Sequence, residues 1–136
     1  MEVAHGNFYT DPHQPVRPGI TRCIPAGHVT EDAGFTLSLA KCDNGNAKRP
    51  HTHEHAQLAI VLEGSCDYYV DGTAYKMVPG SWVYVPSNVE HYIDVHDSKD
   101  AFGNPAPCMN LDVFIPTRPE YVEEYDAFLK SLGVEK

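Results

Sequence analysis

The chain has 136 residues, enough for one domain with a hydrophobic core of its own. Its formal net charge is −9 at pH 7, and no basic run is longer than Lys48-Arg49, which argues against a nucleic-acid or anionic-membrane partner. No apolar run is long enough to span a bilayer, and the first residues lack a signal-peptide pattern. We therefore expect a cytoplasmic protein.

Four cysteines are spread along the chain without a C-x-x-C pair, at Cys23, Cys42, Cys66 and Cys108. In a reducing compartment such cysteines are typically small buried thiols. We expect buried thiols here, and disulfides remain the alternative at this stage.

The first 32 residues contain four of the eleven prolines and show little periodicity. We predict an irregular N-terminal arm over residues 1–32 with room for one or two short strands. A single domain is expected to follow over residues 33–136.

Short alternating or apolar segments follow the arm, with glycine and proline between them. They predict strands over residues 35–42, 57–62, 66–70, 73–78, 81–85, 91–96 and 109–115. Asp71-Gly72 is a strong hairpin signal between the third and fourth of these strands. The pattern indicates an all-β fold, a small antiparallel β-barrel or jelly roll.

The C-terminal segment has a different, helical periodicity. Pro119 suits the first turn of a helix, and Gly133 suits its end. We predict a helix over residues 119–132 that packs against the barrel through one apolar stripe of Tyr121, Val122, Tyr125, Phe128, Leu129 and Leu132.

Three histidines and a glutamine fall within residues 51–57, which predicts a metal site. His51 and His53 are two residues apart and leave an extended strand from the same face. On a straight strand Gln57 would lie roughly 20 Å from His51, so the chain must turn back within residues 54–56 if Gln57 binds the same ion. His91, after the turn-rich residues 86–90, is the candidate fourth ligand.

The other histidines of these segments are weaker candidates for metal ligands. His55 is an alternative ligand to Gln57. We favour the interpretation that it lies behind the ligands or at the surface. His96 has opposite parity to His91, so we expect it to point away from the ion. Imidazole ligands suit several divalent transition metals, and zinc, nickel and iron all fit the predicted set.

The last predicted strand carries a second group of functional candidates. Asp112 and Phe114 share a face, and an inward orientation would place an acid or base beside the ion. Arg118 follows the strand end and could bind a substrate carboxylate with its guanidinium. The alternatives are an outward Asp112 and an Arg118 that caps the helix region or pairs with Glu120.

The metal segment also resembles a known superfamily. Gly45, His51, His53, Gln57 and Gly64 match G-x5-H-x-H-x3-[EQ]-x6-G, which is similar to the first cupin motif. Gly80, Pro86 and His91 resemble the second motif. This chain has Asn88 in place of an inner glycine, Val95 in place of the closing asparagine, and Gln57 in place of an acidic ligand. A neutral ligand set leaves the full divalent charge on the ion, which favours Lewis-acid chemistry.

Residues 45–125 further resemble KdgF-type cupins of pectin degradation. The resemblance implies a homodimeric enzyme that opens 4,5-unsaturated monouronates to 5-keto-4-deoxyuronates, with a carboxylate-bearing sugar as substrate. It implies metal ligands at His51, His53, Gln57 and His91. It also implies functional roles for Asp112, Phe114 and Arg118.

Two departures from that family and two other function classes accompany the resemblance. The N-terminal arm is longer, and the loop over residues 97–107 is expected to border the pocket mouth. A metal-dependent dioxygenase and a non-catalytic small-molecule-binding cupin are the alternative functions.

Overall fold

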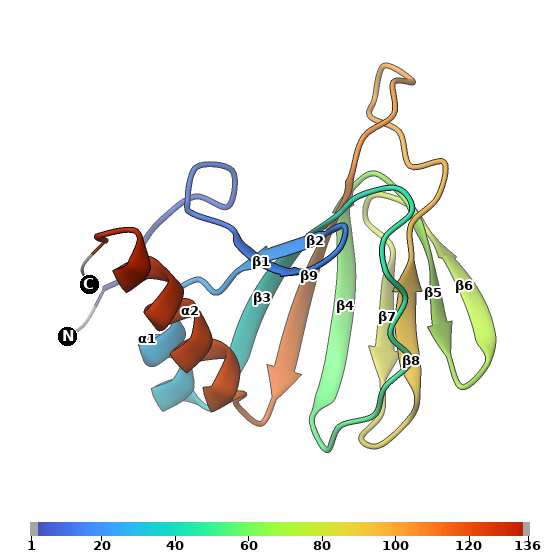
Figure 1. Ribbon diagram of the computed structural model, residues 1–136. Helices are drawn as coiled ribbons and strands as arrows, with labels where there is room; N and C mark the ends of the chain where they lie inside the picture. Colours follow the sequence, from blue (N-terminus) through green and yellow to red (C-terminus); the bar gives the residue numbers. More distant parts are fainter. Residues whose placement is uncertain (1–2, 135–136) are drawn as a thin grey trace.

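Nine strands and two helices make up the fold of the computed structural model, which describes residues 3–134 (Figure 1). The strands are β1 (Gln14–Arg17), β2 (Ile20–Cys23), β3 (Thr36–Cys42), β4 (Ala56–Glu63), β5 (Cys66–Val70), β6 (Thr73–Met77), β7 (Trp82–Val85), β8 (His91–Asp94) and β9 (Cys108–Ile115). The helices are α1 (Gly27–Ala33) and α2 (Pro119–Ser131). All seven predicted strands are therefore present, with ends that differ by one or two residues.

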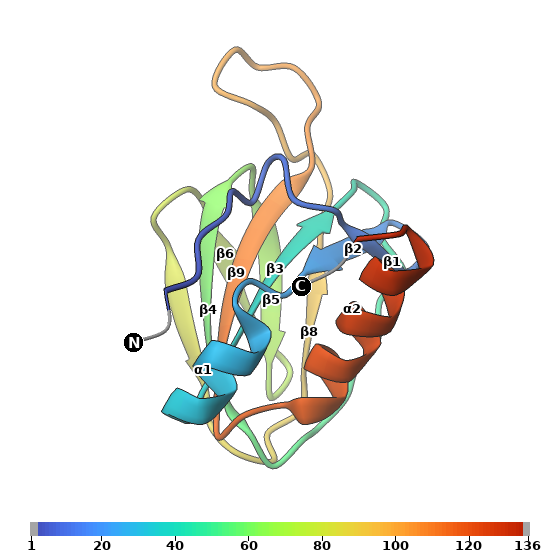
Figure 2. The ribbon, with the colours of Figure 1, turned by 90° about the vertical axis from the view of Figure 1, so that its left-hand side faces the viewer.

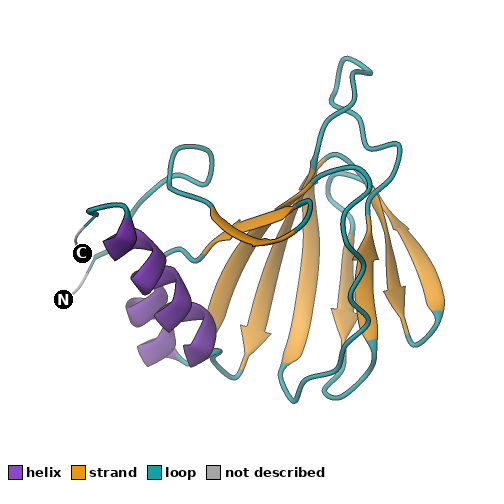
Figure 3. Cartoon of the chain, in the orientation of Figure 1, coloured by secondary structure: helices purple, strands orange, loops and turns teal. Residues whose placement is uncertain are grey.

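The strands form two antiparallel sheets, one of six strands and one of three (Figure 3). The larger sheet has the order β1-β2-β3-β9-β4-β7, and the smaller has the order β6-β5-β8. Because β9 pairs with β3 on one side and β4 on the other, the last strand lies in the middle of the larger sheet. The predicted antiparallel jelly roll is confirmed.

The hairpin between β5 and β6 turns at the predicted dipeptide. Asp71 and Gly72 have φ values of 50° and 79°. Positive φ at both central residues is the requirement of a two-residue hairpin turn that matches the twist of its strands. Local sequence alone thus fixes the register of this hairpin, in which Val70 faces Thr73.

The N-terminal region is more ordered than an irregular arm. It contains β1, β2 and the unpredicted helix α1, which runs past the expected boundary at residue 32. The turn between β1 and β2 is bonded to the segment after β3: the backbone N–H of Asp43 donates to Gly19, and that of Ala47 donates to Pro18. The two strands agree with the one or two short strands expected in this segment, and their hairpin closes one side of the barrel.

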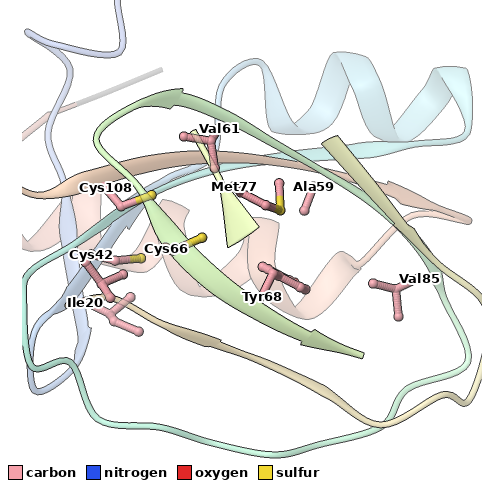
Figure 4. Close-up of a cluster of buried hydrophobic side chains, with 10 residues drawn as sticks. Ile20, Cys42, Ala59, Val61, Cys66, Tyr68, Met77, Val85 and Cys108 are labelled. Carbon is pink, nitrogen blue, oxygen red and sulfur yellow. The ribbon is translucent and has the colours of Figure 1, made fainter. Parts of the chain in front are cut away.

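Two apolar cores lie on opposite faces of the larger sheet. The inner core fills the space between the sheets and includes the thiols of Cys42, Cys66 and Cys108 (Figure 4). The outer core lies under the helices and includes Cys23 and Leu39. All four cysteines are free and buried, so the expectation of buried thiols is confirmed.

Helix α2 lies with α1 beside β2 and β3, outside the barrel (Figure 2). The buried side chains of α2 are Val122, Tyr125 and Leu129, whereas Leu132 is 54% exposed. Tyr121 and Phe128 are partly buried against the same core, so the predicted apolar stripe is confirmed except for Leu132, which lies beyond the helix end. Gly133 has a φ of 77° and follows the helix end, as its sequence position indicated. In the described part of the chain, no helix has the length and apolarity needed to cross a membrane.

The loop over residues 97–107 lies away from the predicted ligands, contrary to expectation. It joins the end of β8 to the start of β9 and extends from the top of Figure 1. Ser98 packs against Gly64 at this end of the barrel. His91 begins β8 and Arg118 follows β9, so the site lies at the other end. Strand direction thus excludes this loop from the pocket mouth.

Candidate functional site

The three candidate histidines converge because the two sheets meet at one end of the barrel. His51 forms an isolated antiparallel bridge with His91, with N–H···O distances of 3.2 and 3.0 Å. The backbone N–H of Asn88 donates to the carbonyl of His53 at 2.8 Å. Asn88 adopts a φ of 63°, which an asparagine tolerates better than most residues. The turn before β8 therefore holds both histidine segments together.

Backbone hydrogen bonds orient all three imidazole rings in the same way. The Nδ1 atoms of His51, His53 and His91 contact the carbonyls of residues 49, 55 and 89 at 2.6, 2.9 and 2.9 Å. A carbonyl only accepts, so each Nδ1 carries the proton and each Nε2 of a neutral ring presents a lone pair. Ligand atoms of the three rings lie within 4.8 Å of one another.

Gln57 adds a fourth acceptor to this cluster. It is buried on β4, and its Oε1 lies 3.1 Å from the Nε2 of His53. Its Nε2 donates to the hydroxyl of Tyr68 and to Oδ1 of Asp112, both at 2.8 Å. The two donor contacts fix the amide so that its oxygen faces the histidines.

These residues fit a divalent cation. The Nε2 of His53 and the Oε1 of Gln57 are both acceptors, and two acceptors in contact repel unless a positive charge lies between them. Two ligands bound about 2.1 Å from one ion lie roughly 3.0–3.4 Å apart, which the 3.1 Å separation matches. The Nε2 of His91 is buried and has no hydrogen-bond partner among the described residues. The three histidines and Gln57 therefore have the geometry and chemistry to hold a divalent metal ion.

Electrostatics keep these imidazoles in the neutral form that binds metals. Burial lowers the pKa of His51, His53 and His91, and the Arg118 charge adds to this effect at His53 and His91. Neutral rings remain available as ligands to a lower pH than in an exposed histidine.

Asp112 points into the barrel, as the inward reading of β9 predicted. Its carboxylate accepts hydrogen bonds from Gln57 and from Nδ2 of Asn110, at 2.8 and 2.9 Å. Burial raises the pKa of Asp112 to about 6, against the opposing effect of these two donors and of the Arg118 charge. This carboxyl group can therefore gain and lose a proton near neutral pH.

Phe114 and Arg118 flank the histidines and Asp112. The ring of Phe114 is buried, and its centroid lies 5.7 Å from that of His53. The guanidinium of Arg118 lies 4.9 Å from the Phe114 ring centroid and 3.8 Å from that of Tyr121. Arg118 Nε also lies 3.8 Å from a carboxylate oxygen of the exposed Glu120. The alternative pairing is thus present only as a long contact at the protein surface.

A cavity of about 70 Å³, here called the pocket, joins these residues to the N-terminal hairpin. Larger hollows of 410–480 Å³ lie elsewhere, and N-terminal residues contribute to the lining of each. The smaller pocket contains the chemically active groups, because His51, Gln57 and Asp112 line it. Side chains in its wall include Arg17, Arg22, Gln57, Asp112, Phe114 and Arg118.

Several pocket residues were not found from the sequence. Asn110 shares the face of Asp112, so strand parity contained a signal for it. Tyr68 stacks nearly parallel to His91, and Arg17 and Arg22 reach the pocket from the proline-flanked hairpin. No local pattern indicated these three positions, because each depends on which strands meet across the barrel.

The two remaining histidines occupy different environments. His55 is buried, and its ring packs against those of His53 and Phe114, so it lies behind the ligands. His96 is largely exposed beside Asp67 and Asp94. The prediction that His96 points away from the ion is confirmed.

Comparison with known families shows which proteins this chain resembles. A family model described as a cupin domain matches residues 39–102, the part that contains all four candidate ligands. Over these residues the protein resembles the cupin superfamily. The two-sheet fold and the positions of the candidate ligands in this chain agree with that resemblance.

Two solved structures show which individual cupins this chain resembles. The structure of KdgF from a Halomonas species is 27% identical to this protein with a TM-score of 0.66, over 81% of this chain and 92% of that one. An RmlC-like cupin from Shewanella frigidimarina has a TM-score of 0.67 at 21% identity, over 85% of this chain and 93% of that one, and shows the shared fold. The chain thus resembles KdgF over nearly all of that protein.

A curated relative has a different activity. The dimethylsulfoniopropionate lyase DddW of Ruegeria pomeroyi is 29% identical over 70 residues, which are 52% of this chain. The matched part spans 46% of the lyase, so this chain aligns with less than half of that relative.

Proposed function

We propose that this protein is a metal-dependent enzyme that opens 4,5-unsaturated monouronates to linear 5-keto-4-deoxyuronates. The observation that carries this proposal is the position of Gln57, which presents its oxygen to the histidine cluster and its amide nitrogen to Asp112. A metal site and a buried acid are thereby joined within one pocket. The likeness to KdgF supports the same reaction.

Substrate binding follows from the charges and rings of the pocket. Arg118 would pair with the substrate carboxylate, and Phe114 would pack against the sugar ring and exclude water. A bound divalent ion would supply Lewis-acid polarisation of a substrate oxygen. Because three imidazoles and an amide are neutral ligands, they leave the charge of such an ion undiminished.

Asp112 would transfer the proton that the reaction moves. As the bond between C1 and the ring oxygen breaks, Asp112 takes the proton of the C1 hydroxyl and an aldehyde forms at C1. The ring oxygen is released as an enolate, which becomes a ketone at C5 when Asp112 returns the proton to C4. One proton leaves and one arrives, so the reaction is an isomerisation. A pKa near 6 suits a group that acts as base and then as acid.

The test follows the ultraviolet absorbance of a 4,5-unsaturated galacturonate. Metal-loaded protein should accelerate its loss above the spontaneous rate, and chelation should remove the acceleration. Asp112→Asn should reduce turnover at least 100-fold while the bound metal is retained, since Asp112 is not a ligand. No acceleration by metal-loaded protein would refute the proposal, and equal loss of metal and activity would refute the role of Asp112.

The relationship to DddW raises a second candidate, lyase activity on dimethylsulfoniopropionate. That substrate has a carboxylate at one end and a sulfonium cation at the other, and the pocket wall contains the guanidinium groups of Arg17, Arg22 and Arg118. These arginines would attract the carboxylate of either substrate, but their charges disfavour the sulfonium end. Release of dimethyl sulfide on incubation with this substrate would favour the lyase, and oxygen consumption with the uronate would favour the dioxygenase alternative.

A further inference from the structure

Arg17 has no part in the function proposed above, yet it lines the pocket. It ends β1, where the pairing with β2 becomes irregular and Arg17 faces Ile20. Its Nε is buried and has no hydrogen-bond partner among the described residues, and the same is true of the Nε atoms of Arg22 and Arg118. A buried N–H without a partner is unfavourable, and a ligand that completes its hydrogen bond removes this cost.

The other two arginines of the pocket have partners that Arg17 lacks. Arg22 forms an ion pair with Glu124 at 2.8 Å and stacks on Tyr121 at 3.7 Å. Arg118 donates to the hydroxyl of Tyr121 at 2.9 Å. Within residues 3–134, Arg17 forms no ion pair with a carboxylate, and burial and the charges of Arg49 and Arg22 lower its pKa. Its positive charge is therefore available for an anion in the pocket.

Arg17 and Arg118 approach the histidine cluster from different elements. Arg17, Arg118 and His51 line the same pocket. The charge of Arg17 also lowers the pKa of His51, less than burial, His53 and Arg49 do. The charge of Arg118 lowers the pKa of His53 and His91, after the larger effect of burial. A ligand in this pocket would thus lie beside both guanidinium groups. A carboxylate has two oxygens and about four lone pairs, enough to accept hydrogen bonds from two arginines.

We propose that Arg17 is a substrate-binding residue that holds the carboxylate of a sugar acid together with Arg118. This inference rests on the proposed function for the identity of the sugar acid. The N-terminal hairpin then determines specificity, because it supplies the second carboxylate contact and favours uronates over neutral sugars.

The test compares Arg17→Met with Arg49→Gln in metal-loaded protein. Arg49 is exposed, lies in the same electrostatic neighbourhood, and contacts His51 only through its backbone carbonyl. It therefore controls for the loss of one positive charge near the cluster. Arg17→Met should raise KM for the unsaturated galacturonate at least tenfold with kcat changed less than about threefold. Arg49→Gln should change neither constant more than twofold.

Binding of two saturated sugars separates this inference from the reaction. By calorimetry, D-galacturonate should bind the wild type with higher affinity than D-galactose, and Arg17→Met should remove most of that difference. Arg17→Lys should recover part of it, because a lysine restores the charge without the planar pair of donors. Metal content and thermal midpoint, measured for every variant, identify a variant that has lost the site itself.

The outcomes distinguish the two proposals. Turnover by the wild type with an unchanged KM in Arg17→Met would refute the role of Arg17 and leave the ring-opening function standing. Arginine-dependent binding of galacturonate without turnover would refute ring opening and support the carboxylate site. Equal binding of galacturonate and galactose by the wild type would refute the carboxylate site.

Discussion

At the scale of single residues, Gln57 links the candidate metal site to Asp112, the proposed proton carrier. One amide makes a contact of each kind, because its oxygen can only accept and its nitrogen can only donate. A glutamate at this position would present the same shape without the donor. Replacing Gln57 with glutamate therefore tests the contact of its oxygen with the histidines separately from the contact of its nitrogen with Asp112.

Gln57→Glu is expected to tighten metal binding and to slow turnover. A carboxylate ligand adds negative charge to the ion and raises its affinity, by at least tenfold. The same charge beside Asp112, together with the lost hydrogen bond, raises the Asp112 pKa further and leaves that group protonated at neutral pH. We expect turnover to fall at least tenfold with a pH optimum shifted upward.

Metal titration and pH–rate profiles measure these two effects. Gln57→Ala serves as the control, because it removes the ligand and the donor without adding charge. Wild-type turnover and pH optimum in Gln57→Glu would contradict the link between Gln57 and Asp112.

The raised pKa of Asp112 also predicts a pH-dependent stability. The folded metal-free protein binds this proton more tightly than the unfolded chain, whose carboxyl has a pKa near 3.8. The stabilising contribution is complete below that value and is lost as the pH rises through about 6. A pKa difference of about two units between the folded and unfolded states corresponds to at most about 2–3 kcal/mol in the free energy of unfolding.

Asp112→Asn should therefore be more stable than the wild type at neutral pH, by about 1–3 kcal/mol, and similar to it near pH 4. Urea unfolding of chelator-treated protein at several pH values measures the difference. Subtracting the two curves removes the contribution of the other carboxylates. A difference that stays constant with pH would contradict the buried, proton-binding state of Asp112.

At the scale of structural elements, the turn before β8 positions the histidine segments. Its Asn88 combines left-handed backbone with a hydrogen bond to the carbonyl of His53. The side chain is exposed, so substitution here leaves no buried cavity. Backbone conformation can therefore be tested apart from packing.

Asn88→Ala should lower the free energy of unfolding by about 1 kcal/mol, because alanine disfavours left-handed backbone. Asn88→Gly should lie within about 0.5 kcal/mol of the wild type, since glycine adopts this conformation freely. Because the turn is bonded to His53, the alanine variant should also bind metal several-fold more weakly. Denaturant unfolding and metal titration measure both quantities, and equal behaviour of the two variants would show that the turn is not strained.

Predictability from sequence also varies among the elements. The β5–β6 hairpin and the end of α2 followed from local residues, since Asp71, Gly72 and Gly133 have the positive φ values that their positions require. The β1–β2 hairpin did not, because its pairing with β3 and its contacts with residues 43–47 are long-range. Its contribution of Arg17 and Arg22 to the pocket was consequently missed.

At the scale of the whole molecule, metal binding is expected to stabilise the fold. The ligands come from β4, β8 and the segment between β3 and β4, so an ion would join both sheets. A ligand that binds only the folded state at 100 times its dissociation constant adds about 2.7 kcal/mol to the free energy of unfolding.

Thermal unfolding with and without an added divalent ion tests this expectation. The midpoint should rise in the wild type, and His91→Ala should abolish the rise. Since burial lowers the pKa of the histidines, the metal-induced shift should persist below the usual histidine pKa near 6.5 and vanish as the rings gain protons. An equal rise in His91→Ala would place the ion elsewhere.

The sequence by itself determined the strand-rich fold, the C-terminal helix and the candidate ligands. These features depend on local patterns: alternation, turn residues and the spacing of His51, His53 and Gln57. Strand parity also placed Asp112 and Phe114 on one face. Their common orientation toward the histidines required the pairing of β9 with β4, which the structure supplies.

Only the tertiary structure decided which distant groups share the pocket. In the structure, the loop over residues 97–107 lies at the end of the barrel away from the site. Tyr68, Arg17 and Arg22 line the pocket. The physical reason is that strand direction and sheet order set the end of the barrel at which each side chain lies. Both arise from hydrogen bonds between segments far apart in the chain, which no local pattern of residues records.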